Sequence, residues 1–77
     1  MLKVFVLVNT QIGEAMNVAK ILREKPGILS ADAVFGVYDV IVEAQAEDPK
    51  ALSRLVTFDI QCTPGVNQTL TCMVMEN

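Results

Sequence analysis

The chain contains no histidine and no tryptophan, and only two of its 77 residues are cysteines. Histidine is the commonest general base and metal ligand, so its absence excludes Ser/His/Asp and Cys/His catalytic arrangements. The carboxylates show no metal-ligand spacing, and the glycines form neither a phosphate-binding loop nor a dinucleotide fingerprint. We therefore predict no catalytic residue, no metal and no cofactor. An enzyme stays open only if a partner subunit supplies the catalytic groups.

Positive charge is also scarce. Six Lys and Arg stand against nine Asp and Glu, which gives a net charge of −3, and no basic stripe is present. Direct nucleic-acid binding is not expected from this pattern. The apolar N-terminal run is too short for a membrane span and lacks a cleavage site, so we predict a cytoplasmic chain without membrane contact. Cys62 and Cys72 form no C-x-x-C pair and are predicted to be free thiols buried as small hydrophobes.

Apolar residues, in contrast, are abundant, at 52% of the chain against 19% charged residues. A chain of this length forms one domain, here residues 1–77. Such a domain buries only about 60% of the surface that its unfolded chain exposes. The excess of apolar residues therefore indicates a buried interface.

Two Pro-Gly pairs, Pro26-Gly27 and Pro64-Gly65, mark an internal repeat of 38 residues (64 − 26). Each half reads as a strand, a helix, a Pro-Gly turn and a second strand. Periodicity and turn signals together predict strands at residues 2–8, 28–35, 39–46 and 66–75, with helices at about 14–24 and from 48 to before Pro64. This order predicts an α+β ferredoxin-like βαββαβ fold, a four-stranded antiparallel sheet with two helices on one face.

The second helix is predicted to begin with Asp48 as its N-cap and Pro49 at its first position. Its apolar stripe consists of Leu52, Leu55, Val56 and Ile60. Asp59 falls within this stripe. Either the last turn splays outward and leaves Asp59 in solvent, or Asp59 is a polar group that faces a partner.

The sheet face away from the helices is predicted to be apolar. If the valines of the first strand face the helices, Phe5 and Leu7 point to the outer side, where an antiparallel sheet in water would carry polar residues. A contiguous apolar patch marks an interaction surface, and a second copy is the simplest partner. The opposite parity would expose the valines, so either parity predicts association. The predicted dimer interface consists of Phe5, Leu7, Ile41, Met73 and Met75.

Two motifs carry a family resemblance. The run Phe35-Gly36-Val37-Tyr38-Asp39 leads into an apolar strand, and the last strand reads Pro64-Gly65-Val66-Asn67-Gln68-Thr69-Leu70-Thr71. Together they resemble the G-x-Y-D-hydrophobic and P-G-V-x-x-T-x-T signatures of the effector (RAM) domain of the Lrp/AsnC transcriptional regulator family. The resemblance covers essentially the whole chain. Full regulators carry a helix-turn-helix domain before this module, whereas the first strand here begins at about residue 2. We therefore expect a stand-alone effector domain with no DNA-binding domain.

The resemblance implies an amino-acid effector bound in clefts between assembled dimers. It further implies a homodimer that assembles into an octameric or decameric ring, co-assembly with full-length regulators, and a role in transcription or amino-acid metabolism. Backbone groups of a tight 36–39 turn would bind the ammonium and carboxylate, with Gly36 allowing close approach, and threonine hydroxyls would complete the site. The expected ligand-binding residues are Gly36, Val37, Tyr38, Asp39, Gln68, Thr69 and Thr71.

Structural roles for the same residues stay open. Gly36 can serve a hairpin turn, Tyr38 can cap a sheet edge, Asp39 can bond its own turn, and the threonines favour strands by propensity. Two further functions therefore remain: a purely structural assembly partner of full-length regulators, and an ACT-like regulatory domain with a glycine loop after the first strand. The identity of the amino acid stays open, as does whether Arg54 and Asp59 face the cleft.

Overall fold

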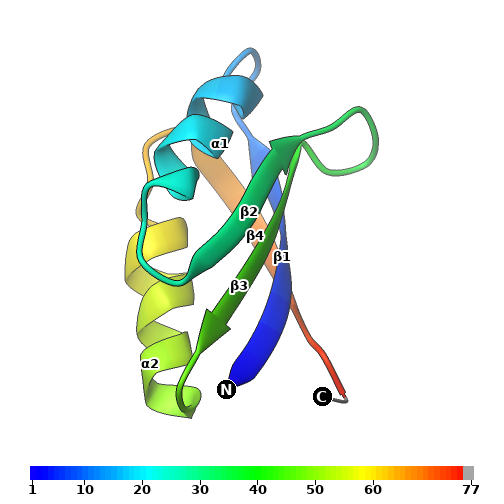
Figure 1. The fold of residues 1–77 in the computed structure, drawn as a ribbon. Helices are drawn as coiled ribbons and strands as arrows, with labels where there is room; N and C mark the ends of the chain where they lie inside the picture. Colours follow the sequence, from blue (N-terminus) through cyan, green and yellow to red (C-terminus); the bar gives the residue numbers. More distant parts are fainter. Residues whose placement is uncertain (76–77) are drawn as a thin grey trace.

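The computed structural model describes residues 1–75 as a four-stranded sheet with helices on one face (Figure 1). In chain order the elements are β1 (Leu2–Thr10), α1 (Ala15–Arg23), β2 (Ile28–Ala33), β3 (Val40–Ala46), α2 (Pro49–Arg54), η1 (Leu55–Ile60) and β4 (Val66–Met73). Neighbouring strands are antiparallel in the order β2-β3-β1-β4. The predicted α+β ferredoxin-like fold is thus confirmed. None of the helices within residues 1–75 is long and apolar enough to cross a membrane.

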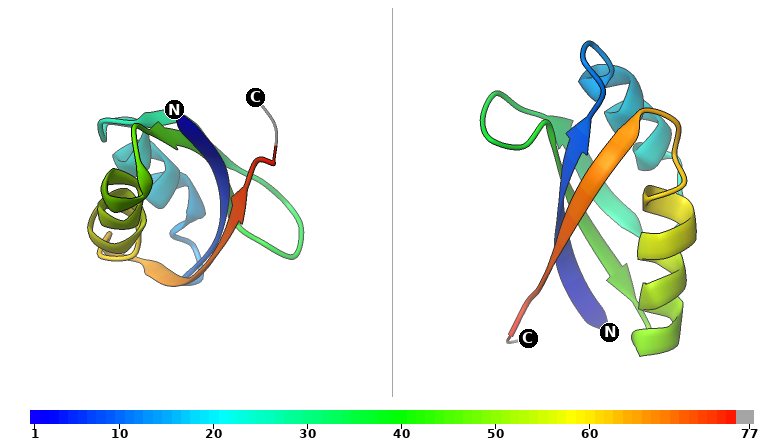
Figure 2. Two further views of the ribbon diagram at one scale, coloured as in Figure 1. Left: turned by 90° about the horizontal axis from the view of Figure 1, so that it is seen from below. Right: turned by 180° about the vertical axis from the view of Figure 1, so that it is seen from behind.

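The core lies between the sheet and the helices (Figure 2). Val4, Val6 and Val8 are fully buried, which confirms the predicted parity of β1. Each such side chain contributes about 1.5–3 kcal/mol to stability when it is fully buried. The helices contribute Val18, Ala19, Leu22, Leu52, Leu55 and Ile60 to this core.

The 38-residue repeat extends to backbone conformation. Gly27 and Gly65 adopt φ values of +87° and +94°, a region that glycine enters without steric cost. The carbonyl of Gly27 accepts a hydrogen bond from the N–H of Gln45 at 2.9 Å, and that of Gly65 accepts from the N–H of Gln11 at 2.8 Å. Each Pro-Gly turn therefore joins the start of its following strand to a neighbouring segment of the sheet.

A β-bulge follows each Pro-Gly turn at the same position. The extra residue is Leu29 in β2 and Asn67 in β4, and these positions are again 38 apart (67 − 29). Beyond a bulge, side chains exchange faces relative to strict alternation. The bulge at Asn67 therefore determines which side chains of β4 face the helices.

Gly27→Ala is expected to destabilise the domain by about 1–3 kcal/mol. A Cβ at Gly27 would lie 3.0 Å from the backbone oxygen of Gln45, and φ there is +87°. Gly36→Ala is the matched control, because a Cβ at Gly36 meets nothing within 4 Å and its φ is not positive. Urea unfolding followed by circular dichroism at one protein concentration measures both. Equal losses for the two variants would contradict this account.

The second helix begins as predicted but changes its hydrogen bonding halfway. The Asp48 side chain accepts a hydrogen bond from the N–H of Ala51 at 2.8 Å, with Pro49 next in the chain. After Arg54 the chain forms a π-helix, η1, in which the N–H of Gln61 donates to the carbonyl of Val56 at 2.9 Å. A π turn adds one residue to the helical repeat.

The residue that the π turn adds accounts for Asp59. This acidic residue stands at a position of the apolar stripe where a core residue is expected. With η1 present, Ile60 lies in the core as the stripe predicts and is 0% exposed, while Asp59 is half-buried. Asp59 also accepts a hydrogen bond on its backbone oxygen from the hydroxyl of Thr63 at 2.7 Å. The expectation of a simply splayed last turn is corrected to a π turn.

Several predicted strand boundaries differ from the structure. β2 ends at Ala33 and β3 begins at Val40, so the connection spans residues 34–39 and is not a tight 36–39 turn. β4 ends at Met73, and Met75 lies beyond the strand. Cys62 and Cys72 are free as predicted, but both are exposed, so the prediction that they are buried is wrong.

Candidate functional site

The 34–39 connection is an open loop whose two ends are held by backbone hydrogen bonds. The N–H of Val34 donates to the carbonyl of Asp39 at 2.9 Å, and the N–H of Asp39 donates to the carbonyl of Val8, also at 2.9 Å. Its middle extends from the sheet on the side away from the helices (Figure 2). Phe35, Gly36 and Val37 are exposed there. A Cβ at Gly36 would meet nothing within 4 Å, so packing within the chain does not require glycine here.

The Asp39 carboxylate has a structural partner. Its Oδ2 accepts a hydrogen bond from the backbone N–H of Thr10 at 2.8 Å. The expected bond within its own turn is therefore replaced by a bond to the end of β1. Tyr38 is half-buried and precedes β3, an inner strand of the sheet. Asp39 thereby positions the loop relative to β1.

The predicted residues of β4 divide between the two faces of the sheet. Thr69 pairs with Val8 and Thr71 with Val6, so both threonines lie on the helix side, whereas Gln68 pairs with Asn9 on the outer side. The Gln61 side-chain amide donates to the hydroxyl of Thr69 at 3.1 Å, and Thr71 is exposed. One chain therefore does not bring the threonines and the 36–39 segment together on one face.

The outer face of the sheet carries an apolar patch, defined here by Phe5, Leu7, Ile41, Leu70 and Cys72. The strand registers place Ile41, Leu7 and Leu70 in one row across three strands, with Cys72 opposite Phe5. Phe5 and Ile41 are 37% and 38% exposed, too open for core residues.

Two residues predicted for this face are placed elsewhere. Met73 pairs with Val4 and therefore points to the helix side, and Met75 follows the strand. The reason is the bulge at Asn67, which reverses the alternation of β4. Leu70 was missed for the same reason.

Charges border the apolar patch. Lys3 Nζ lies 2.6 Å from a carboxylate oxygen of Glu43 and 5.7 Å from the centre of the Phe5 ring. Because both charged side chains are partly exposed, this ion pair contributes little stability, about 0–1 kcal/mol. It gives the patch a polar rim beside an apolar centre.

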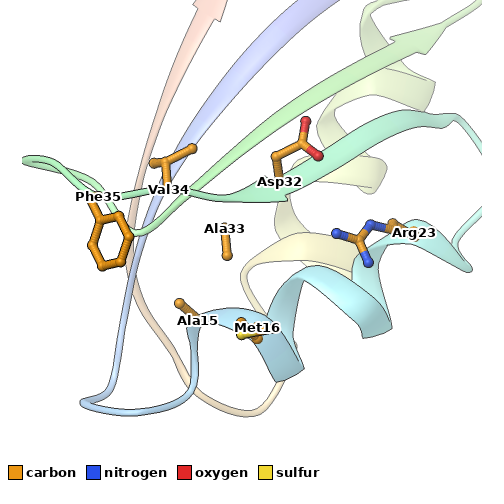
Figure 3. A pocket seen from close by; sticks show the side chains of 7 residues that line it. All are labelled: Ala15, Met16, Arg23, Asp32, Ala33, Val34 and Phe35. Carbon is orange, nitrogen blue, oxygen red and sulfur yellow. The ribbon is translucent and has the colours of Figure 1, made fainter.

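A cleft of about 390 Å³ opens between α1 and the end of β2 (Figure 3). The residues that line the cleft are Ala15, Met16, Arg23, Asp32, Ala33, Val34 and Phe35. Val34 and Phe35 belong to the 34–39 loop, so the cleft adjoins it. Arg23 and Met16 were not predicted as site residues from the sequence. Within residues 1–75 no three Cys, Asp or Glu side chains gather closely enough to hold a metal ion.

The Lrp/AsnC ligand binding domain family matches residues 3–77 of the chain. The hypothetical protein PHS023 from Pyrococcus horikoshii is 28% identical and superposes with a TM-score of 0.91 over 100% of this chain and 93% of that chain. The transcriptional regulator NMB0573 from Neisseria meningitidis, solved as a complex with L-Met, is 26% identical with a TM-score of 0.85. That match covers 97% of this chain and 50% of the regulator.

A biosynthetic enzyme contains a similar segment. Homocitrate synthase from Sulfurisphaera tokodaii is 33% identical over 51 residues, which are 66% of this chain but 11% of the enzyme. The chain thus spans about a tenth of that curated relative. The family match, in contrast, extends over nearly the whole chain, and the superposition with PHS023 shows the same fold. The chain therefore belongs to the Lrp/AsnC ligand-binding domain family.

Proposed function

We propose that the chain is a stand-alone effector module that binds an amino acid between associated copies of itself and thereby modulates transcription or amino-acid metabolism. The family match over residues 3–77 carries this proposal. The L-Met complex of NMB0573 supports an amino acid as the ligand class. In this proposal the 36–39 segment of one copy meets Thr69 and Thr71 of another.

The placement of these residues supports a shared site. The loop extends beyond the outer face, whereas both threonines lie on the helix side of β4. Since β4 is an edge strand with an exposed Thr71, a second copy can approach it. A ligand held by two copies favours the associated state, so amino-acid binding would be linked to assembly.

Dimerisation is proposed through the apolar patch on the outer sheet face. Exposed patches of this kind mark protein interfaces, and a two-fold dimer buries the same surface on both copies. Further association of dimers into an octameric or decameric ring, and mixed assembly with full-length regulators, complete the proposed set of partners. A purely structural assembly partner is the alternative, and it predicts oligomers that no ligand shifts.

Calorimetry against the twenty amino acids, combined with native mass spectrometry, tests the proposal. We expect one or a few amino acids to bind and to shift the oligomer distribution. Absence of binding at millimolar concentration, with a monomer throughout, would refute it. Oligomers without any ligand effect would favour the structural alternative.

Thr71→Val is expected to weaken amino-acid binding about 10- to 100-fold while the dimer persists. The change removes one hydroxyl from an exposed strand position, and a hydrogen bond to a charged group contributes about 1.5–3 kcal/mol. Thr71→Ser keeps the hydroxyl and is the matched control. Titration calorimetry measures the affinity, and light scattering measures the dimer. Unchanged affinity in Thr71→Val would exclude this residue from the site.

A second candidate function is regulation of a biosynthetic enzyme in trans. The match to a segment of homocitrate synthase favours it, because that enzyme includes a related stretch within its own chain. The ligand would be the same class, but the partner would be an enzyme instead of a regulator. Affinity capture of a biosynthetic enzyme whose activity then responds to the bound amino acid distinguishes the two candidates.

A further inference from the structure

The cleft between α1 and β2 lies outside the proposed interface site. It is formed by the start of α1, the end of β2 and the base of the 34–39 loop (Figure 3). Its volume of about 390 Å³ falls in the range of small-molecule sites. Five apolar residues form most of its surface, and one guanidinium stands at one end. The apolar residues are Ala15, Met16, Ala33, Val34 and Phe35.

Arg23 is held in place at this end. Its Nε donates a hydrogen bond to the carbonyl of Ala31 at 2.8 Å. This bond uses one of the five N–H donors of the guanidinium and leaves its charge uncompensated. Among residues 1–75, Arg23 forms no ion pair with a carboxylate. The edge of β2 therefore orients a planar cation whose remaining donors can bind an anion.

Asp32 is the other charged residue of the cleft, but its carboxylate is turned away. Asp32 pairs with Ile41 and so belongs to the outer face of the sheet, whereas Ala33 points toward α1. The charge that reaches the cleft interior is therefore that of Arg23. A single cation with an acidic neighbour favours one carboxylate over a dianion such as phosphate.

We propose that this cleft binds a small monocarboxylate with an apolar chain, with the carboxylate on Arg23 and the chain against Met16, Ala33 and Phe35. Guanidinium groups bind carboxylates in a planar, two-point geometry. The apolar lining matches an aliphatic or thioether chain of amino-acid size. An apolar amino acid and its 2-oxo acid share this chemistry.

The test uses the full chain and titrates it with 4-methylpentanoate, 4-methylpentanamide, L-leucine and 4-methyl-2-oxopentanoate. We expect 4-methylpentanoate to bind and to shift the backbone NMR signals of Ala33, Val34 and Phe35. The uncharged amide is expected to bind about 10- to 100-fold more weakly, since it loses the charge-assisted hydrogen bonds. The affinities for L-leucine and 4-methyl-2-oxopentanoate show whether the cleft prefers the amino acid or the 2-oxo acid. Equal binding of acid and amide would overturn the proposal.

Arg23→Gln is expected to reduce 4-methylpentanoate affinity about 10- to 100-fold, while Arg54→Gln leaves it unchanged. Because Arg23→Gln also removes the bond to Ala31, Met16→Glu provides a second route. It places a negative charge on an exposed lining residue without touching that bond, and it is expected to weaken the acid but not the amide. Wild-type affinity in both variants would refute the site.

Failure of this proposal and failure of the proposed function can be told apart. Thr71→Val belongs to the interface site and is expected to bind 4-methylpentanoate as the wild type does. If no amino acid shifts the oligomers but 4-methylpentanoate still shifts Ala33 and Phe35, the interface site fails and the cleft stands. If 4-methylpentanoate shifts backbone NMR signals only around Thr71, binding in the cleft is refuted.

Discussion

Ile60→Ala is expected to lower the free energy of unfolding by about 2–5 kcal/mol. Ile60 is 0% exposed in the core beneath the sheet, and truncation leaves a cavity there. A domain of this length has a total stability of about 4–12 kcal/mol, so this loss is a large fraction of the total. Urea and thermal unfolding by circular dichroism at fixed protein concentration measure the loss, since association adds to apparent stability.

The neighbouring positions supply the controls for the π turn. Phe58 is 65% exposed, and Phe58→Ala is expected to change stability by less than about 0.5 kcal/mol. In an uninterrupted α-helix Asp59 would point into the core, and Asp59→Leu would stabilise the domain by about 1 kcal/mol or more. With η1 present, Asp59→Leu is expected to have little effect. A large gain for Asp59→Leu together with a small loss for Ile60→Ala would contradict the π turn.

In the dimer proposed above, Leu7→Glu is expected to cause dissociation. Leu7 lies between Ile41 and Leu70 at the centre of the apolar patch. A carboxylate there would be buried without a partner in the associated state, at a cost of about 3–5 kcal/mol. The dissociation constant should therefore rise about 10²- to 10⁴-fold. Light scattering and native mass spectrometry measure the change, and circular dichroism checks that the monomer stays folded.

Met73→Glu is the matched control for Leu7→Glu. The strand register places Met73 on the helix side, opposite Val4, where it is 53% exposed. We expect this variant to keep the proposed dimer. If Met73→Glu dissociates and Leu7→Glu does not, the interface includes Met73, as strict alternation along β4 predicts.

Local chemistry in the sequence was enough to determine the fold. Positive φ at Gly27 and Gly65 and the cap at Asp48 follow from neighbouring residues, so each was predictable. The family resemblance likewise depends on short motifs, and the match over residues 3–77 confirms it. The roles of the individual ligand-binding residues remain predictions.

The tertiary structure alone decided which side chains share a surface. The bulge at Asn67 moves Met73 from the outer face to the helix side and brings Leu70 outward, and η1 leaves Asp59 half-buried while Ile60 stays in the core. Each change depends on a single extra residue, and the alternation of a strand or the apolar stripe of a helix does not show where that residue lies.

The same distinction holds for the candidate site. The Asp39 carboxylate reaches the N–H of Thr10, 29 residues away, and Arg23 reaches the carbonyl of Ala31 across the α1–β2 turn. Neither partner can be inferred from residue spacing. The sequence by itself determined the elements, their order and the apolar excess that predicts association. The three-dimensional packing determined the faces, because a shift of one residue redirects every side chain that follows it.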